Sequence, residues 1–377
     1  MKYRWITHVL LFLFIGIGSN NLISGQIVSA GGKKISAAEM DQFLQSQLDS
    51  IGMPGLSIAI ISNGKIVYHR ALGIANVDTK IKTDENSIFE AASLSKPVFT
   101  YLVMKMVDKG LLNLDTPLYK YMPYADIAGD ERYKLITARI VLTHRTGFPN
   151  WRYFEKADTS MHIKRGDLYL KFTPGTQYSY SGEGFLYLAK VIAHLNRLNL
   201  QTLEPLYELE VARPLGMGHA YYTGNDYIYK HKVSGHVDGK VTFFNGSIWP
   251  ICFPGWDSSY FNPAAGLHTD AISYAHFMIG LMNGKGLSNK SFAEMLKPQS
   301  ILPKDKVNED GDFAEGLGLF IAKTPYGTVY EHGGNNDNFQ SHFLWYSSPK
   351  DGYVFFTNCD KGVDFNKRLK LFLTDNK

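Results

Sequence analysis

Apolar positions at helical spacing and short β-branched runs alternate along the first part of the chain. Residues 35–51 carry apolar side chains three and four positions apart, which predicts an amphipathic helix. The apolar run 56–61 predicts a strand. Asn63-Gly64 follows it, the strongest short signal for a hairpin turn, and leads to a return strand at 66–69. We therefore expect the chain to open with a helix and an antiparallel hairpin.

The middle of the chain favours helices, and its end favours strands. Residues 96–109 predict a long helix that Gly110 ends. Between Pro/Gly-rich loops, the clearest further helices are 185–196 and 271–282. Strand patterns return at 317–322, 328–331, 342–346 and 353–357, before a final helix containing 369–373. We expect an α/β (α+β) fold, with one antiparallel sheet built from both chain ends, flanking helices and an inserted, mostly helical lobe.

This arrangement predicts a single catalytic domain over residues 31–377. The α/β lobe would comprise about 31–114 and 287–377, and the helical lobe about 115–286. A cleft between two such lobes is a usual place for a substrate.

The first residues have the layout of a secretory signal peptide. Lys2 and Arg4 precede the unbroken apolar stretch 9–18, and small or polar residues follow. We assign residues 1–30 to this signal, with the cleavage site open between Ser19 and Ala30. The apolar core is shorter than the roughly 20 residues that cross a bilayer, so no stable membrane insertion is expected after cleavage. An uncleaved anchor is the alternative. The expected location is periplasmic or secreted.

Composition narrows the possible partners and cofactors. The 377 residues carry a net charge of +4 without a long run of like charge, which gives no argument for nucleic acid. The 12 histidines show no metal-ligand spacing, so we expect no metal and no cofactor, and only a small-molecule or peptide substrate. The two cysteines, Cys252 and Cys359, are compatible with a disulfide or with two buried thiols.

A Ser-x-x-Lys pattern is the first candidate for chemistry. It occurs three times, but the copies at Ser62 and Ser347 fall in a turn and a loop, and only Ser93-x-x-Lys96 begins a long helix. Residues three apart share one helix face, and free N–H groups at a helix start can stabilise an oxyanion. A lysine that loses its solvation there can accept the serine proton. The competing interpretation is a capping serine and a surface lysine.

Two further segments could contribute to the same site. Residues 174–185 read as a turn, a polar stretch and a helix, and Tyr180 on such a loop could transfer protons if nearby cations lower its pKa. His332, Gly333 and Gly334 end a predicted strand, where a histidine could orient or protonate a leaving group. For each segment taken alone there is a simpler alternative. Tyr180 could be a tyrosine packed at the surface of a lobe, and residues 332–334 could be a simple turn.

Together these segments resemble one family, the class C β-lactamase-like serine hydrolases. That family includes class C β-lactamases, D-Ala-D-Ala peptidases, D-amino-acid peptidases and some esterases. The resemblance runs from about residue 52 to 356 and is carried by Ser93-x-x-Lys96, Tyr180-Ser181-Gly182 and His332-Gly333-Gly334, with supporting stretches at 52–55, 142–147, 263–267 and 316–318. It implies a β-lactamase/transpeptidase-like fold.

The resemblance also implies roles for individual residues. Ser93 matches the acylated nucleophile and Lys96 its partner in proton transfer. Tyr180 matches a phenolate that accepts the serine proton or activates the hydrolytic water. His332 stands where true β-lactamases have the lysine of a Lys-Thr-Gly triad, with Gly333 and Gly334 beside it on the substrate side. The N–H groups of Ser93 and Asn335 resemble an oxyanion hole.

Two departures from the family pattern bear on the substrate. Gly182 replaces the asparagine of Tyr-x-Asn, and the adjacent Glu183 is the candidate substitute. His332-Gly333 replaces Lys-Thr, which suits a substrate carboxylate less well. We expect an exported serine hydrolase that acts through a Ser93 acyl-enzyme on a β-lactam, peptide or ester carbonyl. The alternatives are a D-amino-acid peptidase or carboxylesterase without β-lactamase activity, and a non-catalytic relative that binds cell-wall fragments or a partner.

Overall fold

A large antiparallel sheet organises the computed structural model, which describes residues 26–156, 162–243, 252–304 and 311–374. The apolar stretch 9–18 of the expected signal lies outside these residues. In spatial order the strands of the sheet are β11 (Ser300–Ile301), β12 (Asp312–Glu315), β13 (Phe320–Thr324), β14 (Gly327–Asn335), β15 (Gln340–Tyr346), β16 (Gly352–Thr357), β3 (Gly55–Ser62), β4 (Lys65–Asn76) and β5 (Ile81–Lys82).

The two chain ends meet in the middle of this sheet. Strand β16 pairs with β3, so that Val354 lies opposite Ala59, and β3 turns into β4 through the expected hairpin. The expectation of one antiparallel sheet from both ends of the chain is therefore confirmed.

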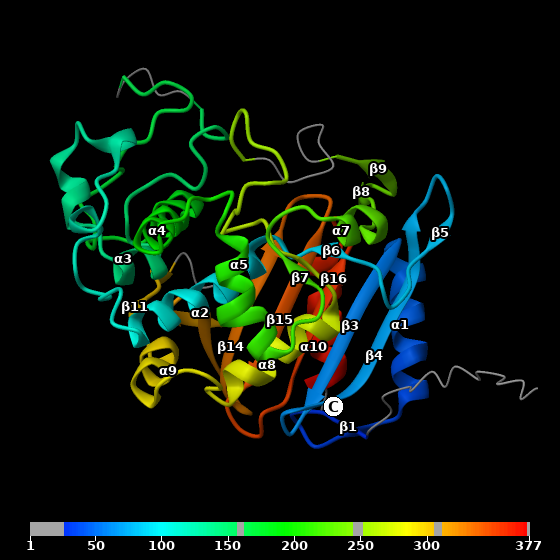
Figure 1. The fold of residues 1–377 in the computed structure, drawn as a ribbon. Coiled ribbons are helices and arrows are strands. Elements are labelled where there is room, and N and C mark those ends of the chain that lie inside the picture. The colour runs from blue at the N-terminus through cyan, green and yellow to red at the C-terminus, as the bar shows by residue number, and fades with distance from the viewer. Residues whose placement is uncertain (1–25, 157–161, 244–251, 305–310, 375–377) are drawn as a thin grey trace, which may run out of the picture.

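Helices cover both faces of the sheet (Figure 1). Helices α1 (Ala37–Ile51) and α10 (Gly362–Thr374) pack on one face with a compact apolar cluster, and the rings of Phe43 and Phe372 stack 4.1 Å apart between them. Helices α2 (Ser95–Asp108) and α8 (Ala271–Met282) lie on the other face, within the larger core that continues into the helical region.

Shorter elements complete the molecule. The remaining helices are α3 (Ala138–Leu142), α4 (Gly182–Leu195), α5 (Glu204–Tyr207), α6 (Arg213–Leu215), α7 (Asp226–His231) and α9 (Asn289–Leu296), with single turns η1 (Ala92–Leu94), η2 (Leu118–Lys120), η3 (Ala125–Ile127), η4 (Glu131–Leu135) and η5 (Glu208–Ala212). The remaining strands are β1 (Ile27–Val28), β2 (Lys34–Ile35), β6 (Phe89–Glu90), β7 (Ala220–Tyr221), β8 (Gly235–Val237), β9 (Lys240–Thr242) and β10 (His268–Thr269).

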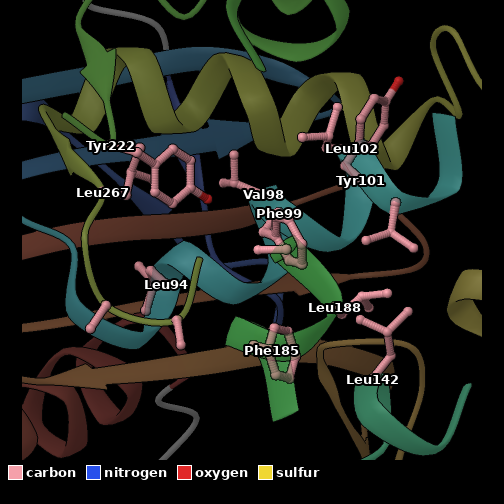
Figure 2. Packing of buried hydrophobic residues seen from close by; sticks show 14 of the residues in the cluster. Leu94, Val98, Phe99, Tyr101, Leu102, Leu142, Phe185, Leu188, Tyr222 and Leu267 are labelled. Carbon is pink, nitrogen blue, oxygen red and sulfur yellow. The ribbon is translucent and has the colours of Figure 1, made fainter. Parts of the chain in front are cut away.

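Helix α2 runs through the centre of the larger core and is buried over almost its whole length. Figure 2 shows Val98 and Phe99 of this helix pointing into the cluster, with Phe185 of α4 beside them. The Phe99 and Phe185 ring centroids lie 6.2 Å apart. Each large apolar side chain buried in this way contributes about 1.5–3 kcal/mol. The segment that follows Ser93 is therefore fixed in place on all sides.

Two local expectations are wrong. Residues 317–319, predicted as part of a strand, precede β13; Gly318 has a φ of +69° and its backbone lies against the side chain of Thr100. Strand β14 continues to Asn335, so the two glycines after His332 lie inside a strand and not in a turn. Cys252 and Cys359 are both buried free thiols.

Candidate active site

Ser93 and Lys96 lie together where η1 runs into α2. Lys96 Nζ is 3.1 Å from Ser93 Oγ and 2.9 Å from the carbonyl oxygen of Ala264. The Lys96 side chain is 1% exposed, and its nitrogen lies 4.6 Å from the centroid of the Tyr180 ring. The competing interpretation, in which Lys96 is a surface lysine, is therefore wrong.

Burial determines the charge of Lys96. Loss of solvation lowers the pKa of Lys96 to about 7, because a charged amine is disfavoured away from water. Among the residues that the structure describes, no carboxylate forms an ion pair with it. A substantial fraction of Lys96 is therefore neutral near pH 7, and a neutral amine beside a serine hydroxyl can accept its proton.

The segment 263–267 holds the start of α2 in place. Leu267 N donates to Ser95 Oγ over 2.9 Å, and its carbonyl accepts from Ala91 N over 2.8 Å. Between them Ala92 has a φ of +48°, which is uncommon for a residue with a side chain. Such strain is maintained only where neighbouring contacts enforce it, as these hydrogen bonds do here.

Tyr180 approaches Ser93 from the loop before α4. Its hydroxyl is hydrogen-bonded to the Ser93 side chain. Burial raises the pKa of Tyr180 above its ordinary value, although the bond to Ser93 opposes this effect. The condition set in the sequence analysis, a pKa lowered by nearby cations, is not met, because loss of solvation raises the pKa of Tyr180. Tyr180 is a neutral phenol in this site.

His144 contacts Tyr180, although sequence analysis gave this residue of the supporting stretch 142–147 no role in the site. Its ring stacks on Tyr180 with centroids 4.0 Å apart, and its Nδ1 accepts a hydrogen bond from Ser181 N over 3.0 Å. Its carbonyl accepts from Ser179 N over 2.8 Å. Burial, together with the charge of Lys96, holds the pKa of His144 well below its usual range. A neutral ring that accepts at Nδ1 carries its proton on Nε2.

His332 faces the same region from β14. Its Nδ1 donates to the carbonyl of Gly333 over 2.7 Å, which leaves Nε2 as an acceptor. Burial and the nearby charge of Lys96 lower the pKa of His332 to about 3. The side chain is 2% exposed, and Nε2 has no hydrogen-bond partner within the described ranges. This position therefore holds a neutral, buried imidazole where a Lys-Thr-Gly triad has a cation.

Glycine allows β14 to approach the start of the helix. A Cβ on Gly334 would lie 2.5 Å from the carbonyl oxygen of Ala91 and 2.2 Å from Ser341 Oγ. Those two atoms are themselves hydrogen-bonded at 2.8 Å. No side chain fits there, so strand β14 runs directly beside the turn that carries Ser93.

A cleft of about 720 Å³ lies over these residues. The structure brings almost all of the predicted site residues to its wall: Ser93, Tyr180, His332, Gly333, Gly334 and Asn335. Lys96 lies behind Ser93 and is bonded to it. Asn150, Asp312 and Glu331 also line the cleft, and sequence reasoning assigned none of them to the site.

Glu183 does not replace the missing asparagine. Its carboxylate is fully buried and accepts from Arg152 Nε over 2.9 Å and from Arg152 Nη2 over 2.8 Å. The suggestion that Glu183 substitutes for an amide at position 182 is therefore wrong. The space beside Gly182 is filled by Trp151, since a Cβ there would lie 2.4 Å from the indole ring.

The fold and the site define a class of protein: an antiparallel sheet with a helical lobe, and a Ser-x-x-Lys serine at the start of a buried helix that opens on the cleft. The Beta-lactamase family model matches residues 40–373. The chain belongs to the Beta-lactamase family, a family of serine hydrolases. The resemblance found in the sequence is thereby confirmed.

Individual relatives are distant. Protein flp of Staphylococcus aureus (strain NCTC 8325 / PS 47) is 24% identical over 326 residues, which cover 84% of this chain and 62% of that protein. Esterase EstB of Burkholderia gladioli is 28% identical over 200 residues, covering 48% of this chain and 50% of the esterase. The matched part is thus less than two thirds of the length of either relative.

Solved structures share the fold. A class C β-lactamase superposes with a TM-score of 0.69 at 18% identity, covering 89% of this chain and 96% of that one. A D-amino acid amidase from Ochrobactrum anthropi SV3, complexed with D-phenylalanine, gives a TM-score of 0.69 at 20% identity, covering 89% and 98%. At these identities the likeness shows a β-lactamase/transpeptidase-like fold and nothing finer.

Proposed function

We propose that this protein is an exported serine hydrolase that forms an acyl-enzyme on Ser93. One observation carries the proposal: the buried Lys96 amine, with a pKa of about 7, lies 3.1 Å from the Ser93 hydroxyl at the wall of a cleft. A serine paired with a base within hydrogen-bond reach is the arrangement that nucleophilic catalysis requires.

Acylation begins with proton transfer inside this pair. Neutral Lys96 takes the Ser93 proton as Oγ bonds to the substrate carbonyl carbon, and the carbonyl oxygen becomes an oxyanion. In this proposal the N–H groups of Ser93 and Asn335 stabilise that charge. The oxyanion then collapses and the bond to the leaving group breaks. The Tyr180 hydroxyl gives its proton to the leaving group and recovers one from Lys96.

Deacylation uses Lys96 and Ser93 again, with water as the nucleophile. A water molecule attacks the acyl carbon while Lys96 accepts its proton, and Ser93 Oγ leaves with a proton returned from Lys96. In acylation Tyr180 acts as a neutral proton carrier. This differs from the phenolate that the family resemblance implied, because burial raises the pKa of Tyr180.

The polar groups of the cleft favour an ester or amide carbonyl over a β-lactam. A β-lactam bears a carboxylate, and the His332 imidazole at the cleft wall carries no charge to bind that group, since its pKa is about 3. Carboxylate binding needs donors or cations. The esterase EstB and the D-amino acid amidase are relatives whose names indicate the two substrate classes that we favour.

Export to the periplasm or the exterior rests on the signal-like residues 1–30, with their basic start and apolar stretch. None of the helices between residues 26 and 374 that the structure describes is long and apolar enough to cross a membrane. Cleavage before Ile27 would retain β1, which pairs with β2 and buries the Ile27 side chain.

The test is hydrolysis by purified protein of a p-nitrophenyl ester, a D-amino-acid anilide and a chromogenic cephalosporin, with Ser93→Ala as the control. We expect turnover of the ester or anilide that Ser93→Ala abolishes, with the thermal unfolding midpoint unchanged. Turnover of the cephalosporin at a higher kcat/KM would assign the β-lactam instead.

A fluorophosphonate probe distinguishes the enzyme from a non-catalytic relative. The proposal predicts a covalent adduct on Ser93, found by peptide mass spectrometry, and no adduct in Ser93→Ala. Folded protein that neither labels nor turns over any substrate would favour a protein that only binds cell-wall fragments or a partner in this cleft.

A further inference from the structure

Glu90 and Asn336 connect the two segments whose N–H groups are the proposed oxyanion donors. Glu90 lies three residues before Ser93, and Asn336 directly follows Asn335. Asn336 Nδ2 donates to Glu90 Oε2 over 2.7 Å. Glu90 is 2% exposed and Asn336 is 6% exposed. A hydrogen bond is stronger away from water, so this contact restrains the two segments relative to each other.

The strand register directs the N–H of Asn335 towards the cleft. Asn336 N donates to the carbonyl of Phe339 across the hairpin over 2.9 Å. In an antiparallel pair only alternate residues exchange hydrogen bonds with the partner strand, so the N–H of Asn335 points away from β15. Within the described residues, the pairing of β13 with β14 ends at Glu331, and Asn335 lines the cleft. The N–H of Asn335 therefore faces the cleft.

Lys232 holds Glu90 from the other end of the carboxylate. Lys232 Nζ donates to Glu90 Oε1 over 2.7 Å, and the two side chains are 12% and 2% exposed. Each oxygen of Glu90 therefore has its own donor. Because a carboxylate only accepts, the end of the Asn336 amide that faces Glu90 is its NH₂ group.

A second contact holds the strand on the other side of Asn335. Ser341 Oγ, on β15 opposite Gly334, donates to the carbonyl of Ala91 over 2.8 Å. The two contacts thus restrain β14 one residue before and one residue after Asn335. If the contact with Ser341 acted alone, the strand could pivot about Gly334 and displace the N–H of Asn335.

We propose that Glu90 is a positioning residue, which acts through Asn336 to set the distance between the two oxyanion donors. This inference rests on the proposed function and assigns to Glu90 no contact with the substrate. An oxyanion hole stabilises the transition state only when its donors lie within about 0.5 Å of the productive geometry. Loss of the bond between Glu90 and Asn336 should therefore slow the chemical step and leave substrate binding largely intact.

The experiment compares a p-nitrophenyl ester with its thionoester, in which sulfur replaces the carbonyl oxygen. Sulfur is a weak hydrogen-bond acceptor, so the thionoester gains little from the N–H donors. The ratio of the two kcat/KM values therefore reports on the oxyanion hole. A loss of folded protein would instead lower both values equally.

Exchange of the two chemical groups tests the contact directly. Asn336→Asp places a second carboxylate against Glu90, and Asn336→Ala removes the donor without adding a charge. Glu90→Gln combined with Asn336→Asp restores one donor and one acceptor, with the direction of the bond reversed. Asn338→Asp is the matched control, because this buried asparagine of the same hairpin donates to the carbonyl of Thr242.

We expect Asn336→Asp and Asn336→Ala to lower kcat/KM about tenfold for the ester and less than about twofold for the thionoester, through kcat and not KM. The exchanged pair should recover at least about half of the wild-type ratio. Asn338→Asp should keep that ratio, although its thermal midpoint falls.

An equal loss on both substrates in the Asn336 variants, or an equal loss of the ratio in Asn338→Asp, would overturn the inference alone. If the wild type hydrolyses neither substrate, the proposed function itself fails and the role of Glu90 fails with it.

Discussion

The imidazole of His144 stacks on the phenol of Tyr180, with ring centroids 4.0 Å apart and an interplanar angle of 29°. His144 also holds the backbone on both sides of Tyr180, since Ser179 N donates to its carbonyl and Ser181 N to its Nδ1. His144 touches neither the cleft wall nor Ser93 in the described contacts, so it is a positioning residue for Tyr180.

Replacing His144 by alanine should therefore impair catalysis through Tyr180. We expect kcat to fall by about 10–100-fold, the loss typical of a reacting group displaced by about 1 Å. KM should change little, because no substrate contact is removed. His144→Asn is the matched control: asparagine tolerates the φ of +51° and can still accept from Ser181 N, so its thermal midpoint should stay closer to wild type. An unchanged kcat in His144→Ala would show that Tyr180 needs no such support.

The rise of kcat/KM on the acid side of the pH profile should reflect the loss of the proton from Lys96. Burial lowers the pKa of Lys96 to about 7, and only the neutral amine can accept the Ser93 proton. In the free enzyme kcat/KM should therefore rise with pH and reach half its plateau near pH 7. His332 and His144 are neutral throughout this range, since the pKa of each is lowered further.

Lys96→Arg provides the control for this assignment. Arginine stays protonated at all accessible pH values, so the variant should be inactive from about pH 5 to 9. A wild-type profile that falls with increasing pH, or that shows no inflection between about pH 6 and 8, would contradict Lys96 as the base.

Burial of Lys96 should lower the free energy of unfolding. Its pKa is lower in the folded state than in the unfolded chain, so the unfolded state binds more protons between about pH 7 and 10.5. Below pH 7 the folded protein bears the full penalty, and the penalty disappears as pH rises through the unfolded value. We expect Lys96→Met to raise the free energy of unfolding by about 1–3 kcal/mol at neutral pH, net of the lost bonds to Ser93 and Ala264. Urea unfolding of both proteins should show this gain shrinking towards about pH 10.

The periodicity of the chain determined much of this fold in advance. The helices at 271–282 and 96–109 are predictable because unbroken apolar spacing and a following Asn or Gly define their ends. The extent of β14 was not predictable, because Gly333 and Gly334 resemble a turn in isolation. Only the approach of Ala91 and Ser341 shows that glycine is needed there for close packing within the sheet.

The residues of the site also differ in whether the sequence alone could identify them. Ser93 and Lys96 are recognisable because their spacing on one helix is local information. His144 and Ala264 lie in the supporting stretches 142–147 and 263–267, but their contacts with Tyr180 and Lys96 arise from tertiary packing, which the sequence does not show. Asn150 lines the cleft, and no local pattern indicates this. The raised pKa of Tyr180 could not be predicted, because the extent of burial cannot be read from a sequence.

Restoring a cation on β14 should change which substrates are preferred. His332→Lys would place an ammonium where the neutral imidazole now offers only an acceptor. A hydrogen bond to a charged partner is stronger than a neutral one, so the kcat/KM ratio of a carboxylate-bearing ester to its methyl-capped analogue should increase roughly tenfold.

The new charge would also repel the charged form of Lys96 and move the acid limb to lower pH. His332→Gln, which adds a neutral donor, should leave that limb near pH 7 and separates the effect of charge from that of hydrogen bonding. If the ratio and the acid limb both stay at their wild-type values in His332→Lys, this position does not contact the substrate and does not sense Lys96.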